Sequence, residues 1–345
     1  MNIAIRTDSS VTIGSGHVMR CFTLADLLAD KGHRVYFICR DLPGNMSNML
    51  VARGYPVFLL PGEDFNGVQD AAQTAALLAE QKPDWLITDH YQIDEKWEAL
   101  QRRYVGSIMA IDDLADRKHD CDLLLDQNLY QNQGARYEGL VPSNCRKLLG
   151  PRFVLLRKEF DEARRRLKPR TGNISRILLF FGGSDPDNVT AKALKAFELF
   201  DYDDICLDVV VGEMNPNKQQ IEEDCSRLKN ARYYCQVDNM ASLMLEADLA
   251  IGAGGTATWE RSCLGLPCIT LLIAENQVEV TEAVASNDAT WNLGWHETVT
   301  SERIAEVIQF ARNNPLIVKR VGEKALALMV GNEEGRQLLV TELAR

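Results

Sequence analysis

The sequence of 345 residues lacks an excess of basic side chains and lacks long apolar runs. Its 38 lysines and arginines face 49 aspartates and glutamates, which gives a net charge of −11. Because nucleic-acid binding needs a basic surface, a nucleic-acid partner is not expected. No apolar run approaches the roughly 20 residues of a membrane-spanning helix, so no membrane partner is expected either. Met1 leads directly into an apolar, strand-like stretch, which predicts that there is no signal peptide.

The usual motifs of metal, disulfide and cofactor sites are also missing. The nine cysteines contain no Cys-x-x-Cys pair, which predicts buried, reduced thiols in a cytoplasmic protein. The histidines other than His17 are not spaced as a zinc set, and the Asp-x-Asp triplets at 120–122 and 185–187 are common by chance. There is no P-loop motif, and no G-x-G-x-x-G follows the first strand-like run. We therefore predict no metal and no cofactor.

What the chain does have is a regular alternation of strand-like and helix-like segments. With 46% hydrophobic and 25% charged residues, it is typical of a well-packed soluble protein. One alternating series runs from residue 2 to residue 128, and a second begins at residue 176. A polar connector at 129–151 and a charged helix ending near Pro169 separate them. This pattern predicts an α/β fold with two doubly wound, Rossmann-like domains, residues 1–160 and 173–345, facing a central cleft.

In open α/β sheets, ligands bind at the carboxyl ends of the strands, so the turns after strands are the places to search. The first such turn contains Gly14, Gly16 and His17. Glycines allow a positive φ and a close backbone approach to a ligand. His17 falls in the first turn of the following helix, whose N-terminus favours the uncharged, basic form of the ring. The residue is therefore a candidate general base, although a capping histidine on an ordinary loop is the alternative.

Two further glycine turns follow apolar strands in the second half. Gly182 and Gly183 precede Asp187 and Asn188, either of which could cap the next helix. Backbone amides of this turn could hold a diphosphate, or the glycines could serve the turn alone.

The third turn places Gly254 and Gly255 before a helix that opens with Thr256, and its N-terminus offers a second anion site. Glu260 lies one helical turn after Thr256, where its carboxylate could accept hydrogen bonds from a ribose diol. The alternatives for Glu260 are a capping-box partner and a solvated surface side chain.

Six segments in this order resemble a known family: GSGHVMRC, TDHY, LLRKEF, FFGGSDPDN, GAGGTATWERSCLGLP and ENQ. Together they resemble the UDP-2,4-diacetamido-2,4,6-trideoxy-β-L-altropyranose hydrolases of pseudaminic acid biosynthesis. The fifth segment is also similar to the wider GT-B group of UDP-sugar enzymes. The resemblance implies a GT-B fold in which the C-terminal domain holds UDP. It implies metal-independent water attack at the anomeric carbon with inversion, releasing UDP and the free sugar, for a pathway that serves flagellin glycosylation.

The resemblance also implies roles for individual residues. His17 matches the position that activates water, and Tyr91 matches a tyrosine near the sugar. Asp112 and the neighbouring Asp113 are further candidates at the end of a strand, where an aspartate often only caps a turn. The predicted substrate-binding residues are Gly14, Ser15, Gly16, Arg20, Asp112, Arg157, Asn276 and Gln277. The predicted nucleotide-binding residues are Gly182, Gly183, Ser184, Gly254, Gly255, Thr256 and Glu260.

The predicted partners are a UDP-sugar, water and enzymes of the same pathway. Three alternative functions remain open at this point. A glycosyltransferase would pass the sugar to an alcohol, and a hydrolysing UDP-sugar 2-epimerase would use carboxylates for proton chemistry at C2. A nucleotide-sugar binding module would not need His17 at all.

Overall fold

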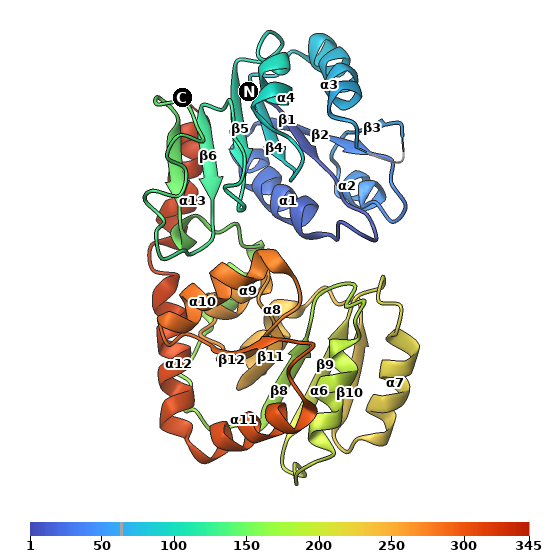
Figure 1. The fold of residues 1–345 in the computed structure, drawn as a ribbon, viewed down its shortest axis with the longest axis vertical. Helices are drawn as coiled ribbons and strands as arrows, with labels where there is room; N and C mark the ends of the chain where they lie inside the picture. Colours follow the sequence, from blue (N-terminus) through green and yellow to red (C-terminus); the bar gives the residue numbers. More distant parts are fainter. Residues whose placement is uncertain (63–64, 345) are drawn as a thin grey trace. The chain divides into compact units, whose positions relative to one another are not determined.

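The structure is a computed structural model that describes residues 1–62 and 65–344. The chain forms two compact units (Figure 1). Met1–Leu155 and Gly331–Arg345 make up unit 1, and Leu156–Val330 makes up unit 2. Each unit is built on one sheet in which every strand pair is parallel. The predicted pair of doubly wound α/β domains is thus confirmed.

Unit 1 has a seven-stranded sheet in the order β3-β2-β1-β4-β5-β6-β7. Its strands are β1 (Asn2–Thr7), β2 (Arg34–Arg40), β3 (Val57–Leu60), β4 (Trp85–Asp89), β5 (Ser107–Ile111), β6 (Leu123–Asp126) and β7 (Arg146–Leu149). Its helices are α1 (Gly16–Ala29), α2 (Ser47–Ala52), α3 (Gly67–Gln81), α4 (Glu95–Gln101), the short 3₁₀ helix η1 (Pro151–Phe153) and α13 (Asn332–Leu343).

Unit 2 has a six-stranded sheet in the order β10-β9-β8-β11-β12-β13. Its strands are β8 (Arg176–Phe180), β9 (Cys206–Val211), β10 (Ala231–Cys235), β11 (Leu249–Ala253), β12 (Cys268–Leu272) and β13 (Trp291–Trp295). Its helices are α5 (Lys158–Arg165), α6 (Val189–Phe197), α7 (Lys218–Arg227), α8 (Met240–Glu246), α9 (Ala257–Cys263), η2 (Glu275–Gln277), α10 (Val278–Ser286), α11 (Ser301–Asn313) and α12 (Pro315–Leu328).

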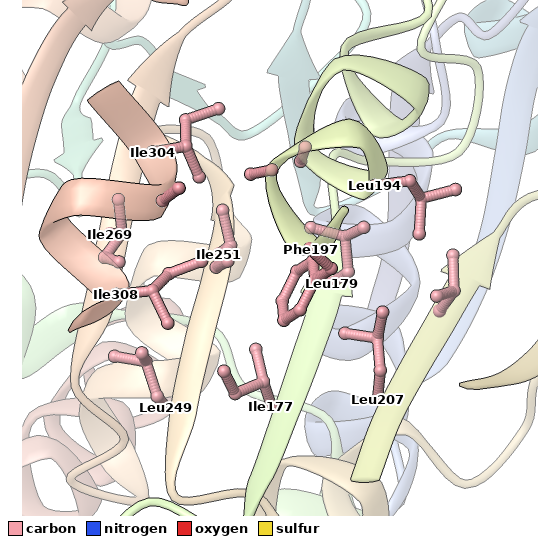
Figure 2. Packing of buried hydrophobic residues seen from close by; sticks show 14 of the residues in the cluster. Ile177, Leu179, Leu194, Phe197, Leu207, Leu249, Ile251, Ile269, Ile304 and Ile308 are labelled. Carbon is pink, nitrogen blue, oxygen red and sulfur yellow. The ribbon is translucent and has the colours of Figure 1, made fainter. Parts of the chain in front are cut away.

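The central strands are short apolar runs because helices cover both faces of a parallel sheet. In unit 2, side chains from α6 and α11 pack on the sheet residues Ile177 and Ile251, as Figure 2 shows. Phe197 of α6 and Ile308 of α11 are fully buried in this cluster. Among the described residues, no helix is both long and apolar enough to cross a bilayer.

The C-terminal helix corrects the predicted domain range of 173–345. Helix α13 belongs to unit 1, where Leu339 and Leu343 join the core that contains Phe153. Asn332 donates to the carbonyl oxygens of three residues in the 151–154 segment, at 2.9 to 3.3 Å. The apolar face of the helix was visible in the sequence, but its spacing does not say which core it covers.

The predicted connector at 129–151 is also corrected. It contains β7, which pairs with β6 from Leu123↔Arg146 to Asp126↔Leu149 and completes the first sheet. The strand has only four residues and begins with two basic ones, so no apolar run marked it. The sequence after residue 278 predicts a helical region with one interruption near 290–298, and the structure shows that this interruption is the edge strand β13.

A buried histidine ties α4 to the segment between β5 and β6. His119 Nδ1 lies 2.9 Å from Glu98 Oε1, and His119 Nε2 lies 3.9 Å from Asp112 Oδ1. Burial lowers the pKa of His119, but Asp112 and Glu98 outweigh it and raise the pKa to about 9. Charged His119 therefore stabilises the fold below pH ~6.5, and this stabilisation is lost as the pH rises through about 9.

We predict that the free energy of unfolding falls by an amount on the order of 3 kcal/mol between pH 6 and pH 10 through this group. In a His119→Gln variant that contribution should be absent, so the variant's stability should depend less on pH than that of the parent protein. Urea unfolding at several pH values measures both. Parallel pH profiles for the two proteins would show that His119 is not charged in the fold.

Gly335 permits the close approach of α13 to η1. A Cβ atom at this position would lie 2.0 Å from the backbone oxygen of Arg152. We predict that Gly335→Ala pushes the helix away and costs about 2 kcal/mol, measured by urea unfolding. Gly134→Ala is the matched control, because nothing lies within 4 Å of its added Cβ and its effect should stay near zero. Equal urea midpoints for both variants would contradict this packing account.

Candidate functional site

Each sheet has one point at which the order of strands reverses. In unit 1 this point lies between β1 and β4, and in unit 2 it lies between β8 and β11. In unit 1, β2 and β3 are added on one side of β1, and β4 to β7 are added on its other side. In unit 2, β9 and β10 lie on one side of β8, and β11 to β13 lie on its other side. Ligands bind doubly wound folds in the crevice at the carboxyl ends of such strands. All three glycine turns singled out in the sequence follow one of these four strands.

In unit 1 this edge brings His17 and Tyr91 together, as predicted for a shared site. His17 lies in the first turn of α1, after β1, and Tyr91 follows β4. Their rings meet edge to face, with centroids 4.5 Å apart and an angle of 80°. Gly14 has a positive φ of 80°, as expected for the turn before α1, whereas Gly16 is already helical. The role of each residue in a reaction stays a prediction.

The residue that sequence reasoning missed is Asp89, the last residue of β4. Its side chain is completely buried, and its Oδ1 lies 2.5 Å from His17 Nδ1. It stands in the TDHY segment, where attention went to the tyrosine. A signal was available: an aspartate ends an apolar strand next to the strand that leads to His17. A buried carboxylate needs compensation, so this aspartate required a partner.

Arg20 supplies that compensation. Its Nε and Nη2 atoms form a two-pronged pair with Asp89, at 2.5 and 2.6 Å. Burial raises the pKa of Asp89, but Arg20 and then His17 outweigh this and hold the pKa well below its usual value. Asp89 is therefore ionised at neutral pH. Arg20 was predicted to contact substrate, but its guanidinium is held by protein carboxylates, so we assign it to positioning.

The contacts of His17 Nδ1 fix the tautomer of the neutral ring. Asp89 Oδ1 at 2.5 Å requires Nδ1 to donate, whereas Arg20 Nη2 at 3.2 Å would require it to accept. The shorter contact decides, because a nitrogen lone pair facing a carboxylate oxygen at that distance would be repelled. The proton therefore sits on Nδ1, and Nε2 carries the lone pair. Such a ring is a proton acceptor at Nε2.

Asp112 was predicted to bind substrate, but the structure surrounds it with protein groups. Arg117 Nη1 lies 2.9 Å from its Oδ1, while the hydroxyl of Tyr137 and the amide of Ala115 donate to its Oδ2. Burial raises the pKa of Asp112, but His119 and Arg117 hold it well below its usual value. These partners indicate a structural role, as in the turn-capping alternative.

In unit 2 the turn after β8 departs from expectation. Gly182 has a φ of 101°, and the turn packs so closely that a Cβ on Gly212 would lie 2.2 Å from the oxygen of Gly183. The N-terminus of α6, however, is already occupied. Asp185 accepts from the amides of Val189 and Thr190, both at 2.9 Å.

Asn188 accepts from Ala191 at 3.4 Å, as one of the two caps considered for α6. Because Asp185 places a carboxylate at the same helix end, this end would repel a diphosphate. The expectation that this helix N-terminus binds an anion is therefore wrong. Binding by Gly182, Gly183 and Ser184 of the turn itself stays a prediction.

The turn after β11 lies against the start of α10. A Cβ on Gly254 would lie 2.1 Å from Thr281 Oγ1, and one on Gly255 would lie 3.6 Å from Gln277 Nε2. Thr256 makes no side-chain cap to α9, so the capping-box alternative finds no support there. Gln277 is held by the amide of Ile273, which donates to its Oε1 at 3.2 Å. The predicted residues of this turn and of η2, Asn276 included, therefore lie in one region of unit 2.

Arg157 and Glu260, predicted separately, form an ion pair. Arg157 Nη2 lies 2.9 Å from Glu260 Oε1, and its Nη1 lies 2.6 Å from Glu159 Oε1. The Glu260 side chain is mostly buried, but 15% of it remains exposed to solvent. Arg157 thereby positions the carboxylate of Glu260, and Glu260 retains oxygen lone pairs for a ligand.

Comparison with known proteins agrees with this architecture. Residues 177–330 match the model of the glycosyltransferase family 28 C-terminal domain. The chain is 28% identical over 292 residues to the UDP-2,4-diacetamido-2,4,6-trideoxy-β-L-altropyranose hydrolase of Campylobacter jejuni, which covers 84% of this chain and 96% of that protein. It is 32% identical over 167 residues, 48% of each chain, to the spore coat polysaccharide biosynthesis protein SpsG of Bacillus subtilis.

Solved structures share the fold at low identity. MurG of Acinetobacter baumannii superposes with a TM-score of 0.68 at 15% identity and covers 99% of both chains. Anabaena HepE, solved in complex with UDP, gives a TM-score of 0.62 at 13% identity over all of both chains. The chain therefore has the GT-B fold, its residues 177–330 match the glycosyltransferase family 28 C-terminal domain, and 84% of it aligns with the Campylobacter hydrolase at 28% identity.

Proposed function

We propose that this protein is a UDP-sugar hydrolase. The substrate is a UDP-2,4-diacetamido-2,4,6-trideoxyhexose, with the altro configuration favoured, and the products are UDP and the free sugar for pseudaminic acid biosynthesis. The relationship to the Campylobacter hydrolase, which spans 84% of this chain, supports the substrate class. The observation that carries the proposal is the hydrogen bond between His17 Nδ1 and the buried, ionised Asp89.

The chemistry follows from this pair. His17 Nε2 takes a proton from water as the water oxygen attacks the anomeric carbon, and the bond from that carbon to the diphosphate oxygen breaks. Attack on the face opposite the leaving group inverts the carbon. Asp89 holds the ring in the required tautomer and stabilises the positive charge that develops on it. Tyr91 restrains the plane of the ring through their edge contact, and its hydroxyl orients the sugar.

The nucleotide is assigned to unit 2. In this proposal Glu260, positioned by Arg157, accepts hydrogen bonds from the ribose hydroxyls. The backbone amides of the turn at Gly254 and Gly255, with Asn276 and Gln277 beside it, receive the diphosphate. The reaction in this form needs no metal ion.

A glycosyltransferase is the second candidate, favoured by the family 28 domain and by the shared fold with MurG. It would use the same base to deprotonate an alcohol in place of water. The two candidates therefore differ in the acceptor and not in the predicted residues.

The deciding experiment supplies UDP-sugars and no acceptor. We expect release of UDP from a 2,4-diacetamido-2,4,6-trideoxyhexose donor, unchanged by a chelator, with ¹⁸O from labelled water on C1 and an inverted anomeric configuration by NMR. Release only after an alcohol is added would identify a transferase, and a sugar inverted at C2 would identify an epimerase. Binding of the sugar nucleotide without release of UDP would identify the protein as a nucleotide-sugar binding module.

The His17–Asp89 pair predicts two matched losses of activity. His17→Gln removes the base. Asp89→Asn removes the carboxylate that orients the His17 ring and stabilises its positive charge during the reaction. Each change should therefore lower kcat by about 10²- to 10⁴-fold. UDP affinity, measured by calorimetry, should be unchanged. His33→Gln is the control, because this histidine lies beside the N-terminal amine, at the amino ends of the strands and not at the carboxyl ends where His17 lies. Wild-type turnover in either pair variant would refute the assignment.

The ribose contact predicts a separate loss of binding. Glu260→Gln should weaken UDP affinity by about tenfold or more, since it replaces a charged hydrogen-bond acceptor. Glu282→Gln, on an exposed position of α10, is the control and should bind UDP like the parent protein. Calorimetric titration with UDP measures both. Equal affinities for all three proteins would mean that the nucleotide binds elsewhere.

A further inference from the structure

We propose that Asp113 is a positioning residue that sets the proton affinity of His17 through Arg20. For its effect on turnover this inference rests on the proposed hydrolase function, but its effect on the histidine does not. The observation behind it is a row of four side chains with alternating charge, His17–Asp89–Arg20–Asp113. Nothing in the sequence spacing shows this row, because its members come from α1, the end of β4 and the end of β5.

The guanidinium of Arg20 joins two carboxylates with different atoms. Its Nε and Nη2 contact Asp89, while its Nη1 donates to Asp113 Oδ2 at 2.8 Å. Arg20 is 6% exposed and the Asp113 side chain is 11% exposed, so water screens these charges weakly. A planar guanidinium with donors on two sides can bridge two carboxylates, which a lysine ammonium cannot do with the same geometry.

The charges of the row decide its effect on His17. Asp89 and Arg20 alone sum to zero, so together they would exert little net pull on a proton at the ring. With Asp113 the three groups sum to −1, and the imidazolium that forms during proton transfer is stabilised. The positive charge of Arg20 would otherwise cancel the negative potential that Asp89 creates at the His17 ring. The negative charge of Asp113 offsets that of Arg20, so the potential at the ring stays negative.

The other groups around His17 carry no competing charge. Cys21 Sγ lies 3.3 Å from Asp89 Oδ2, and burial raises the pKa of Cys21, so its thiol stays neutral. Burial also lowers the pKa of His90, and the amide of Gln92 donates to His90 Nδ1 at 3.1 Å, as a neutral ring requires. Tyr91 presents a ring to His17.

Apart from Asp112, which Arg117 and the hydroxyl of Tyr137 hold, further carboxylates at this edge are Asp8 and Asp126. Arg6 pairs with Asp8 through Nη1 and Nη2, at 2.5 and 2.9 Å. On the far side of Asp113, burial and, to a smaller extent, the charge on Asp113 raise the pKa of Asp126 to about 7. Asp126 receives hydrogen bonds from the hydroxyl of Tyr137 and the amide of Asn128. Neither carboxylate forms a bond to Arg20 in the structure, so Asp113 is the group that faces its free side.

The hydrogen bonding of Asp113 itself fits an electrostatic role. Its Oδ1 is buried and makes no hydrogen bond within the described part of the chain. A side chain that served only to anchor Arg20 could be an asparagine or a serine, with no charge to bury. Burying a carboxylate with one oxygen that lacks a hydrogen bond costs free energy. An asparagine or a serine would avoid this cost but would carry no negative charge.

The test is an NMR titration of His17, assigned by comparison with His17→Gln. Asp113→Asn keeps the shape of the side chain and removes its charge, and we expect the titration midpoint of His17 to fall by about 1 pH unit. If Asp113 only anchored Arg20, its loss would free Arg20 from Asp89 and the midpoint would rise. A rise, or an unchanged midpoint, overturns the proposal.

Three further variants keep the test decisive. Asp113→Glu retains the charge and should restore the parent midpoint, while Asp113→Ser replaces Asp113→Asn if the latter does not fold. Asp116→Asn is the matched control, because it removes an exposed carboxylate three residues away that pairs with Arg117. Its His17 midpoint should match that of the parent protein.

Activity separates this inference from the proposed function. If the parent protein releases UDP from the sugar nucleotide, the acid limb of its pH profile of kcat/KM should shift in Asp113→Asn in the same direction as the NMR midpoint. A parent protein without hydrolase activity would refute the proposed function, whereas the NMR midpoint would still confirm or overturn the role of Asp113.

Discussion

The contact on which the rest of unit 1 depends is the pairing of the buried Asp89 carboxylate with His17 and Arg20. A fully buried anion is tolerable only if partners replace the water it has lost. Here the partners come from α1, so the helix that carries His17 is bound to the end of β4 by charge as well as by packing. The same requirement draws in Asp113 from the end of β5. Chemistry and fold are therefore joined, because loss of Asp89 or of Arg20 would leave its charged partner without compensation in the interior.

The two units carry different kinds of side chain at the point where the strand order reverses, which lies between β1 and β4 in unit 1 and between β8 and β11 in unit 2. In unit 1 the edge between β1 and β4 carries buried ionised groups and a histidine whose Nδ1 is held by one of them. In unit 2 the corresponding edge carries glycine turns, with the side chains of Thr281 and Gln277 beside Gly254 and Gly255. Asp185 closes the N-terminus of α6, and our proposal therefore assigns the nucleotide to the β11 side, with Gly254 and the Arg157–Glu260 pair.

Local patterns in the sequence predicted what depends on local structure. The strand and helix alternation and the positive φ of Gly14 follow from segments that fold as isolated βα units, whereas the contact of His17 with Tyr91 joins two such units. Asp89 was missed because the prediction for the TDHY segment rested on Tyr91, whereas the turn-capping alternative given for strand-end aspartates holds for Asp112. The distant helix α1 brings Arg20 to Asp89, whereas the charged partner of Asp112, Arg117, comes from the segment that directly follows it. The return of α13 to unit 1 was missed for the same reason, since its partners are about 180 residues away.

The central claim is that Asp89 fixes His17 with its proton on Nδ1 and its lone pair on Nε2. Nitrogen-15 NMR of labelled histidine distinguishes the two neutral tautomers directly, at a pH above the titration of the ring. The account predicts that His17 carries its proton on Nδ1 in the parent protein. A His17 ring protonated on Nε2 would contradict the account, because that nitrogen could then accept no proton from water.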